Sequence, residues 1–165
     1  MAEPTRITRP DGTVLELVET IPAESEGRRP SRAKARKRAL DILYEADLRE
    51  LPAADVLAAH RDQNDPPVRE FTVELVEGVE AHRSELDGLI AAHLASGWTL
   101  ERMPRVDRNL ARIAAYELLH TATPHDVTLS EAISLCEELS TDESPAFLNG
   151  LLSALLAGSG HGSEA

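Results

Sequence analysis

The sequence has little of what disulfide-bonded, metal-clustering or membrane-spanning proteins need. Cys136 is the single cysteine among 165 residues, which excludes an internal disulfide and a cysteine-based metal cluster. No apolar run is long enough to cross a bilayer, and the N-terminus lacks the apolar core of a signal peptide. We therefore expect a cytoplasmic protein without a membrane partner. Aromatic residues make up only 3% of the chain, so aliphatic side chains must fill the core.

The usual patterns of catalytic residues are also missing. No glycine-rich phosphate loop, nucleophile elbow or Cys–His pair occurs. The histidines are scattered, without the i, i+4 spacing of a helical metal site. They are His60, His82, His93, His120, His125 and His161. The sequence thus predicts no enzyme, no cofactor and no metal ion, and Cys136 falls on an apolar stripe as an inert core residue.

Apolar residues recur at helical spacing through most of the chain. Together with an apolar content of 42%, this predicts one compact, all-α domain over residues 28–157. Residues 1–27 are broken by prolines, and residues 13–18 alternate like a short strand with nothing to pair against. We therefore expect a disordered or weakly structured extension over 1–27, and a flexible, glycine-rich tail over 158–165.

Prolines and capping residues divide this domain into helices. In the first helix, Leu40, Tyr44 and Leu48 form a second apolar stripe, which predicts burial between neighbouring helices. Gly78 or His82 marks a kink in the third helix. The expected helices begin near Ser31, run over about 52–61, from Pro66 or Pro67 to Leu94 and over about 104–120, and begin at a capping box on Thr128 and at Ser144.

The charge is uneven along the chain. The net charge is −12, yet seven cations occur without an acid between Arg28 and Arg38. Eight basic and 23 acidic residues follow, so the remainder carries −15. A basic patch on an acidic protein confines phosphate attraction to one place, which favours RNA binding over a merely solvated helix start. The cations are Arg28, Arg29, Arg32, Lys34, Arg36, Lys37 and Arg38.

Four segments, in order, resemble the motifs of the NusB family. Ala35-Arg-Lys-Arg-Ala-Leu-Asp-Ile-Leu-Tyr44 resembles the arginine-rich start of its first helix, which runs into A-x-x-x-L-Y. Val106-Asp-Arg-Asn-Leu-Ala-Arg-Ile-Ala-Ala-Tyr-Glu-Leu118 resembles D-R-x-x-L-R-x-A-x-Y-E-L. Leu129-Ser-Glu-Ala132 is similar to I-N-E-A, with Ser130 in the place of Asn, and Ser144-Pro-Ala-Phe-Leu-Asn-Gly-Leu-Leu152 is similar to S-x-x-F-V-N-G-V-L.

The resemblance implies an all-α, NusB-type fold of two packed helical sub-bundles with about six to seven helices. It also implies a transcription antitermination factor that acts in ribosomal RNA transcription. Such a factor binds boxA-type single-stranded RNA together with the ribosomal protein NusE, in an antitermination complex with RNA polymerase. The family includes monomers and homodimers. On charge grounds we expect an acidic face to attract the basic ribosomal protein.

Candidate site residues follow from the charge pattern and the resemblance. Tyr44 and Tyr116 can each stack on a base or pack in the core, and Glu117 falls on an apolar stripe where it needs a partner such as an Arg. Arg105, Arg108 and Arg112 form a second basic row or pair with nearby acids, and Asn149 and Gly150 serve close helix packing. The RNA-binding candidates are Arg32, Lys34, Arg36, Lys37, Arg38 and Tyr116; the partner-binding candidates are Tyr44, Arg108 and Glu117.

Two other functions compete with this interpretation. NusB-like domains also occur at the N-terminus of ribosomal RNA cytosine methyltransferases, but such an enzyme needs a glycine-rich cofactor loop, which these 165 residues lack. A helical bundle that binds only proteins would make the basic segment incidental. RNA binding after removal of the cations separates these alternatives.

Overall fold

The computed structural model describes residues 5–8, 14–17 and 30–164. Strands β1 (Thr5–Thr8) and β2 (Val14–Leu17) pair antiparallel, with Thr5 opposite Leu17. The expectation that residues 14–17 have no partner is therefore wrong. The remaining residues of the 1–27 extension lie outside the described part of the chain.

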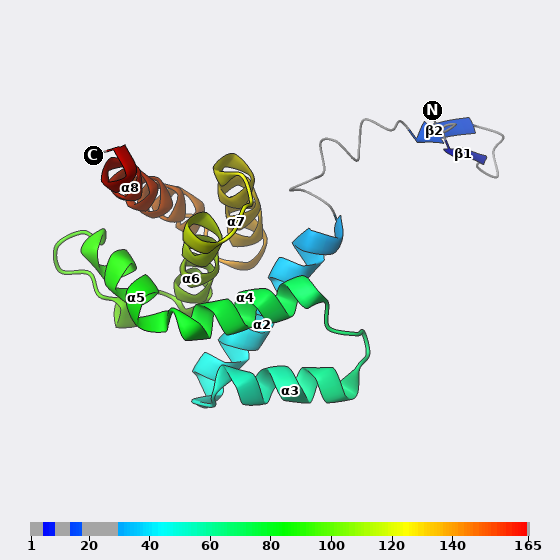
Figure 1. Ribbon diagram of the computed structural model, residues 1–165, viewed down its shortest axis with the longest axis horizontal. Helices are drawn as coiled ribbons and strands as arrows, with labels where there is room; N and C mark the ends of the chain where they lie inside the picture. The colour runs from blue at the N-terminus through cyan, green and yellow to red at the C-terminus, as the bar shows by residue number, and fades with distance from the viewer. Residues whose placement is uncertain (1–4, 9–13, 18–29, 165) are drawn as a thin grey trace.

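Helices make up the rest of the described chain, which contains seven α-helices and one 3₁₀ turn (Figure 1). The expected break at His82 is confirmed, because the third predicted helix is divided there into two. The elements are α2 (Pro30–Arg49), α3 (Ala53–Gln63), α4 (Glu70–Ala81), α5 (Arg83–Ala92), η1 (Leu100–Arg102), α6 (Arg105–His120), α7 (His125–Leu139) and α8 (Ser144–Glu164).

The helices form two packed groups, which confirms the all-α class of fold and the division into sub-bundles. Helices α2, α3 and α4 contact one another, and α6 contacts α5, α7 and α8. The two groups meet where α6 packs against α2 and α4. Figure 1 shows α6 at the centre of the helical body, with the other helices arranged around it.

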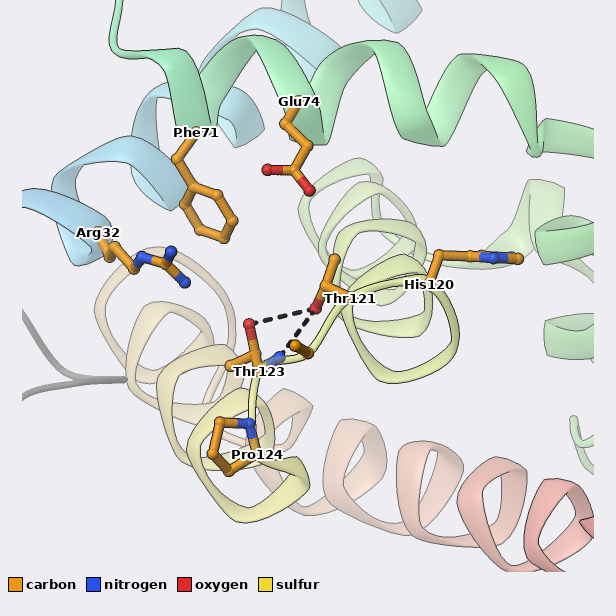
Figure 2. Close-up of a pocket in the computed structure, with 8 residues that line it drawn as sticks. Arg32, Phe71, Glu74, His120, Thr121, Thr123 and Pro124 are labelled. Carbon is orange, nitrogen blue, oxygen red and sulfur yellow. Dashed lines mark hydrogen bonds between the residues drawn. The ribbon is translucent and has the colours of Figure 1, made fainter.

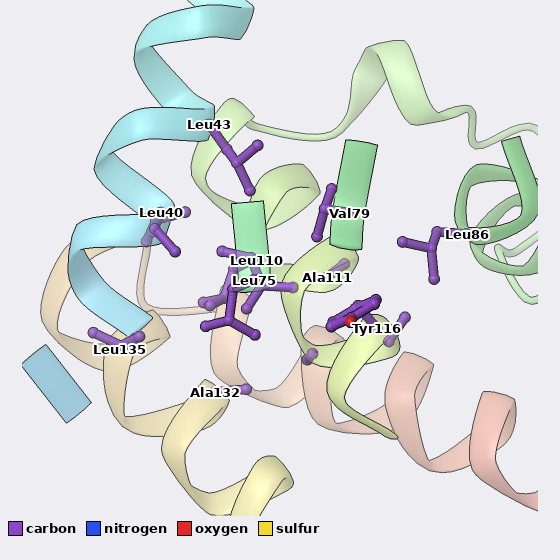
Figure 3. Close-up of a cluster of buried hydrophobic side chains, with 14 of the residues drawn as sticks. Leu40, Leu43, Leu75, Val79, Leu86, Leu110, Ala111, Tyr116, Ala132 and Leu135 are labelled. Carbon is purple, nitrogen blue, oxygen red and sulfur yellow. The ribbon is translucent and has the colours of Figure 1, made fainter. Parts of the chain in front are cut away.

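One aliphatic core runs through both groups. Leu40 of α2, Leu75 of α4 and Leu110 of α6 are buried together at the contact between the groups (Figure 3). Leu135 of α7 extends the same cluster. Since a buried Leu contributes about 1.5–3 kcal/mol of transfer free energy, this cluster accounts for the stability of a chain with few aromatics.

Several predicted boundaries differ from the structure. Helix α4 begins at Glu70, not at Pro66 or Pro67, because Arg69 before it is still extended, with φ −72° and ψ 150°. Helix α7 begins at His125, so Thr128 lies inside the helix and does not cap it. Thr128 is buried and its hydroxyl points to Glu117 Oε2, 3.5 Å away.

Two further expectations about packing are wrong. Helix α8 continues from Gly158 to Glu164, where the sequence predicted a tail, and Gly158 lies close to the His93 ring. Asn149 and Gly150 are exposed, and nothing lies within 4 Å of a Cβ built on Gly150, so this glycine serves no close helix contact. The second apolar stripe of α2 ends at Tyr44, which is half-buried. Leu48, which was expected to continue this stripe, is 51% exposed.

Candidate nucleic-acid interface

The first turns of α2 present cations to three different neighbours. The guanidinium of Arg32 lies over the Phe71 ring of α4, 4.4 Å from its centroid. Lys34 is exposed. Lys37 Nζ lies 2.6 Å from Glu138 Oε1 of α7 in an exposed ion pair, which raises the pKa of Lys37. An exposed pair of this kind leaves the ammonium within reach of a competing phosphate.

Arg38 lies on the side of α2 that faces α3. Its Nε donates to His60 Nδ1 at 3.0 Å, and its Nη1 donates to the Pro66 carbonyl at 3.4 Å. Neither acceptor is a carboxylate, although the charge of Arg38 also acts on exposed Asp41, three residues further along α2. Lys37 and Arg38 therefore lie on different flanks of the helix.

Arg36 is buried, which contradicts its prediction as an RNA-binding residue. Only 2% of its side chain is exposed, and 1% of that of Glu117. Arg36 Nε donates to Glu117 Oε1 at 2.7 Å, and Nη2 donates to Oε2 at 2.9 Å. This two-point pairing uses the planar guanidinium to join α2 to α6. The expectation that Glu117 needs an Arg partner is confirmed, and its placement on a partner surface is wrong.

Tyr116 also lies inside the molecule. It is 8% exposed, and its ring lies so close to Gly78 of α4 that a Cβ on Gly78 would overlap it. Burial, followed by the charge of Glu74, raises the pKa of Tyr116. The ring packs where α4 and α6 meet (Figure 3), so it offers no exposed face on which an RNA base could stack.

Two arginines of the second basic row, Arg108 and Arg112, pair with acids, as one of the two predicted interpretations required, whereas Arg105 is exposed. Arg108 Nη2 lies 2.7 Å from Asp47 of α2, and Arg112 Nε lies 2.7 Å from Asp87 of α5. Burial alone would raise the pKa of Asp47, but the hydrogen bonds from Arg108 and Asn109 outweigh it and lower that pKa. Arg108 is thus held by α2 and is not presented to a partner, whereas half-buried Tyr44 stays a candidate.

A hollow of about 640 Å³ opens beside Arg32 (Figure 2). Phe71 and Glu74 of α4 form one wall, and the turn between α6 and α7 forms the other. In that turn Thr121 Oγ1 donates to the Glu117 carbonyl and to Thr123 Oγ1. The hollow combines a cation, an aromatic ring and hydroxyl groups, which are the groups that bind unpaired nucleotides.

A smaller hollow of about 240 Å³ lies on the α7 side of the helix end. It is lined by Lys34, Lys37, Ser134 and Glu138, among others. Cations therefore lie beside two separate hollows, one on each flank of α2.

Sequence reasoning missed several residues that the structure brings to this region. Phe71 carries no signal of a site in the sequence, although its ring lies under the Arg32 guanidinium. Thr121 and Thr123 directly follow the helix expected over about 104–120, without a pattern that marks a site. No local pattern marks these residues, because the hollow joins segments about 40 to 90 positions apart in the sequence.

Potential metal ligands also meet among the described residues. His82, Glu85 and His120 place one ligand atom each within 4.8 Å of one another. Separately, no helix in the described ranges combines the length and apolar character that a membrane crossing needs.

Comparison with known proteins places this geometry in a family. Residues 33–157 match the NusB family. The transcription antitermination protein NusB of Acidothermus cellulolyticus is 55% identical over 129 residues, which cover 78% of this chain and 88% of that protein. The corresponding protein of Thermobifida fusca is 52% identical over 130 residues, which cover 78% and 91%.

Solved structures agree with this assignment. NusB of T. maritima is 28% identical, with a TM-score of 0.68, over 76% of this chain and 90% of that one. NusB in a complex of the antitermination factors NusB and NusE with double-stranded RNA shares the fold at 24% identity, with a TM-score of 0.69 over 77% and 96%. The predicted resemblance is confirmed: the chain belongs to the NusB family.

Proposed function

We propose that this chain is a cytoplasmic, non-enzymatic transcription antitermination factor that binds boxA-type single-stranded RNA together with the ribosomal protein NusE. In this role it joins an antitermination complex with RNA polymerase during ribosomal RNA transcription. Membership of a family whose curated members are named for transcription antitermination supports the general role. The observation that carries the RNA contact is the exposed cationic end of α2 beside the large hollow.

The RNA-binding residues in this proposal are Arg32, Lys34, Lys37 and Arg38. They surround the helix end on the sides that face α4, α7 and α3, so a strand crosses the end of α2 and does not follow its axis. Lys34 attracts phosphate directly, and Lys37 exchanges Glu138 for a phosphate oxygen at little cost, since an exposed pair is weak.

In this proposal the hollow favours a single strand over a duplex. Unpaired bases can leave the strand and stack on a guanidinium or aromatic plane, whereas paired bases cannot. Arg32 is already oriented by Phe71, so its outer face is ready for a base without further loss of side-chain entropy. The hydroxyl of Thr123 lies on the facing wall, where it can hydrogen-bond a base edge.

The basic ribosomal protein meets an acidic row on α4. Its members are exposed and recur at helical spacing, on a face free of the core. Binding RNA and protein at once makes one composite surface, which raises affinity for both through effective concentration. The row consists of Glu70, Glu77 and Glu80, whereas Glu74 on the same helix lines the hollow.

The test is titration of a fluorescent boxA-type RNA, single-stranded or annealed to its complement, at several salt concentrations and with and without NusE. Arg32→Gln combined with Lys34→Gln removes two cations from the proposed surface. Arg61→Gln combined with Arg105→Gln removes two exposed cations elsewhere. Because each phosphate contact contributes about 0.7 to the slope of log K against log salt, the first pair should lower that slope by about 1.4.

The control pair should leave the slope and the affinity unchanged, and circular dichroism should show intact helices in both. An equal loss of RNA affinity in both double variants would mean that only the overall charge of the protein determines RNA binding. Unchanged affinity in the Arg32 and Lys34 variant would refute the proposed RNA surface. Tighter binding of the duplex than of the single strand would refute the role of the hollow.

A further inference from the structure

Three side chains that ligate divalent metals meet at the break between α4 and α5. His82 occupies the break, Glu85 lies in the first turn of α5, and His120 is the last residue of α6. Glu85 Oε1 lies 2.5 Å from His120 Nε2 and 3.7 Å from His82 Nδ1. The two imidazole rings stack, with centroids 3.9 Å apart and planes 23° apart.

These separations are close to those of a coordinated ion. Zinc binds imidazole nitrogen and carboxylate oxygen at about 2.0–2.2 Å, so neighbouring ligand atoms of a tetrahedral site lie about 3.3 Å apart. The three ligand atoms here lie within 4.8 Å of one another. All three side chains are partly exposed, so their χ angles can rotate to unstack the two imidazole rings and direct the three ligand atoms at one ion.

The backbone that carries these ligands is fixed by the fold. His82 N donates to the Gly78 carbonyl at 3.0 Å, and Leu86 N donates to the His82 carbonyl at 2.9 Å. These bonds hold His82 and Glu85 three positions apart on one side of the junction. Helix α5 packs against α6, which brings His120 to the same place. His120 also lines the large hollow, but Figure 2 shows its ring pointing away from Arg32 and Phe71, so this cluster lies at the edge of the nucleotide hollow.

We propose that His82 Nδ1, His120 Nε2 and the Glu85 carboxylate bind one divalent transition-metal ion, zinc in preference to the others. Two imidazoles and one carboxylate suit zinc, whereas magnesium and calcium require oxygen ligands. A water molecule completes the tetrahedron, because three protein ligands leave one position open.

The ion joins segments that are otherwise linked by packing. It ties the junction of α4 and α5 to the C-terminal end of α6, 35 positions further along the chain. Metal binding to the folded chain alone raises its stability by mass action. The ion therefore fixes the angle between α4 and α5 on the central helix.

The experiment uses the full chain after treatment with a chelator, and titrates it with Zn²⁺ in competition with a chromophoric chelator. We expect one ion per chain and a rise of the unfolding temperature on adding Zn²⁺, with no competition from Mg²⁺. His82→Gln, Glu85→Gln and His120→Gln should each weaken binding at least about tenfold, since even residues behind the ligands contribute that much. His125→Gln and Glu77→Gln are matched controls on exposed residues, and should bind as the unchanged chain does.

Two outcomes would overturn the site. One is the absence of a one-to-one complex. The other is equal zinc affinity in the three ligand variants and the controls, which would place the ion on other histidines. If a variant does not fold, NMR of the unsubstituted chain provides the test instead. In that experiment the imidazole resonances of His82 and His120 must shift when zinc binds. Unmoved resonances would also overturn the proposal.

Discussion

Replacing Arg36 with Ala isolates the buried ion pair between α2 and α6. The Glu117 side chain is 1% exposed, and without Arg36 its carboxylate keeps, among the described residues, the Thr128 hydroxyl at 3.5 Å as its hydrogen-bond donor. An ionised carboxylate that loses its guanidinium in the interior has no water to replace it. We therefore expect a large loss of folding stability and no specific loss of RNA contacts.

The size of the loss follows from burial and geometry. Breaking one partner of a buried ion pair costs about 3–5 kcal/mol, because the other charge stays desolvated. At about 1.4 kcal/mol for each factor of ten, the folding equilibrium falls by two to four orders of magnitude. For a domain of this size, this loss corresponds to a decrease of about 6–20 °C in the unfolding temperature.

Denaturant unfolding, followed by circular dichroism, measures this effect against a neighbouring control. Lys37→Ala breaks an ion pair of nearly the same length, 2.6 Å, but one that is exposed, so we expect no measurable change in stability. Replacing both buried partners, with Arg36→Met and Glu117→Leu, removes the stranded charge and should restore most of the stability.

A loss of folding stability below about 1 kcal/mol for Arg36→Ala would refute this reasoning, since an unpaired carboxylate in the interior costs about 3–5 kcal/mol. So would unchanged stability combined with weaker RNA binding. That result would return Arg36 to the RNA surface, where the sequence placed it.

Two more predictions test the packing of the core. Gly78→Ala should destabilise the chain by about 1–3 kcal/mol in the same unfolding assay, because its Cβ overlaps the Tyr116 ring. Gly88→Ala, in the middle of α5 with open space around it, should instead stabilise by about 0.5–1 kcal/mol; equal effects would contradict the close approach of α4 and α6. Cys136 is buried, and burial raises its thiol pKa to about 11. At pH 8, a thiol reagent should therefore label the folded chain at least about 100-fold more slowly than the chain unfolded in guanidinium, and fast labelling would show that the core is open.

The sequence predicts the fold well where its signals are local. Ser144 and Pro145 predict the start of α8, the kink expected at Gly78 or His82 lies at His82, and apolar spacing predicts the core face of α6. Thr128 shows the limit of such signals. A Thr followed three residues later by a Glu fits a capping box, yet the preceding Pro124 already begins the helix and the hydroxyl is used inside it.

The site was harder to predict, because burial decides what a charge does. Arg36 was grouped with its basic neighbours, although it precedes Leu40 and Leu43 at i, i+4 and i+7, on the apolar side of α2. Glu117 was predicted to be a buried acid that needs a partner, such as an Arg. Combining these two observations would have predicted the pair from the sequence. The hollow beside Arg32 had no comparable signal, since its walls come from three separate segments.

The segment of α6 that resembles the NusB motif is rich in charge because its polar side chains bind the neighbouring helices. Both carboxylate oxygens of buried Asp107 accept hydrogen bonds, from Ser140 and Ser144 at the turn into α8. One turn later Arg112 reaches α5, and at the far end Glu117 reaches α2.

Each of these bonds fixes a different neighbour at a defined height along the same helix. Apolar packing alone is tolerant of sliding, whereas a buried hydrogen bond is lost after a shift of about 1 Å. Charge in this segment therefore specifies how the two groups of helices meet. Arg36 anchors α2, the helix that carries Arg32 and Lys34, to α6. The RNA surface at the end of α2 therefore depends on the charged residues of this segment.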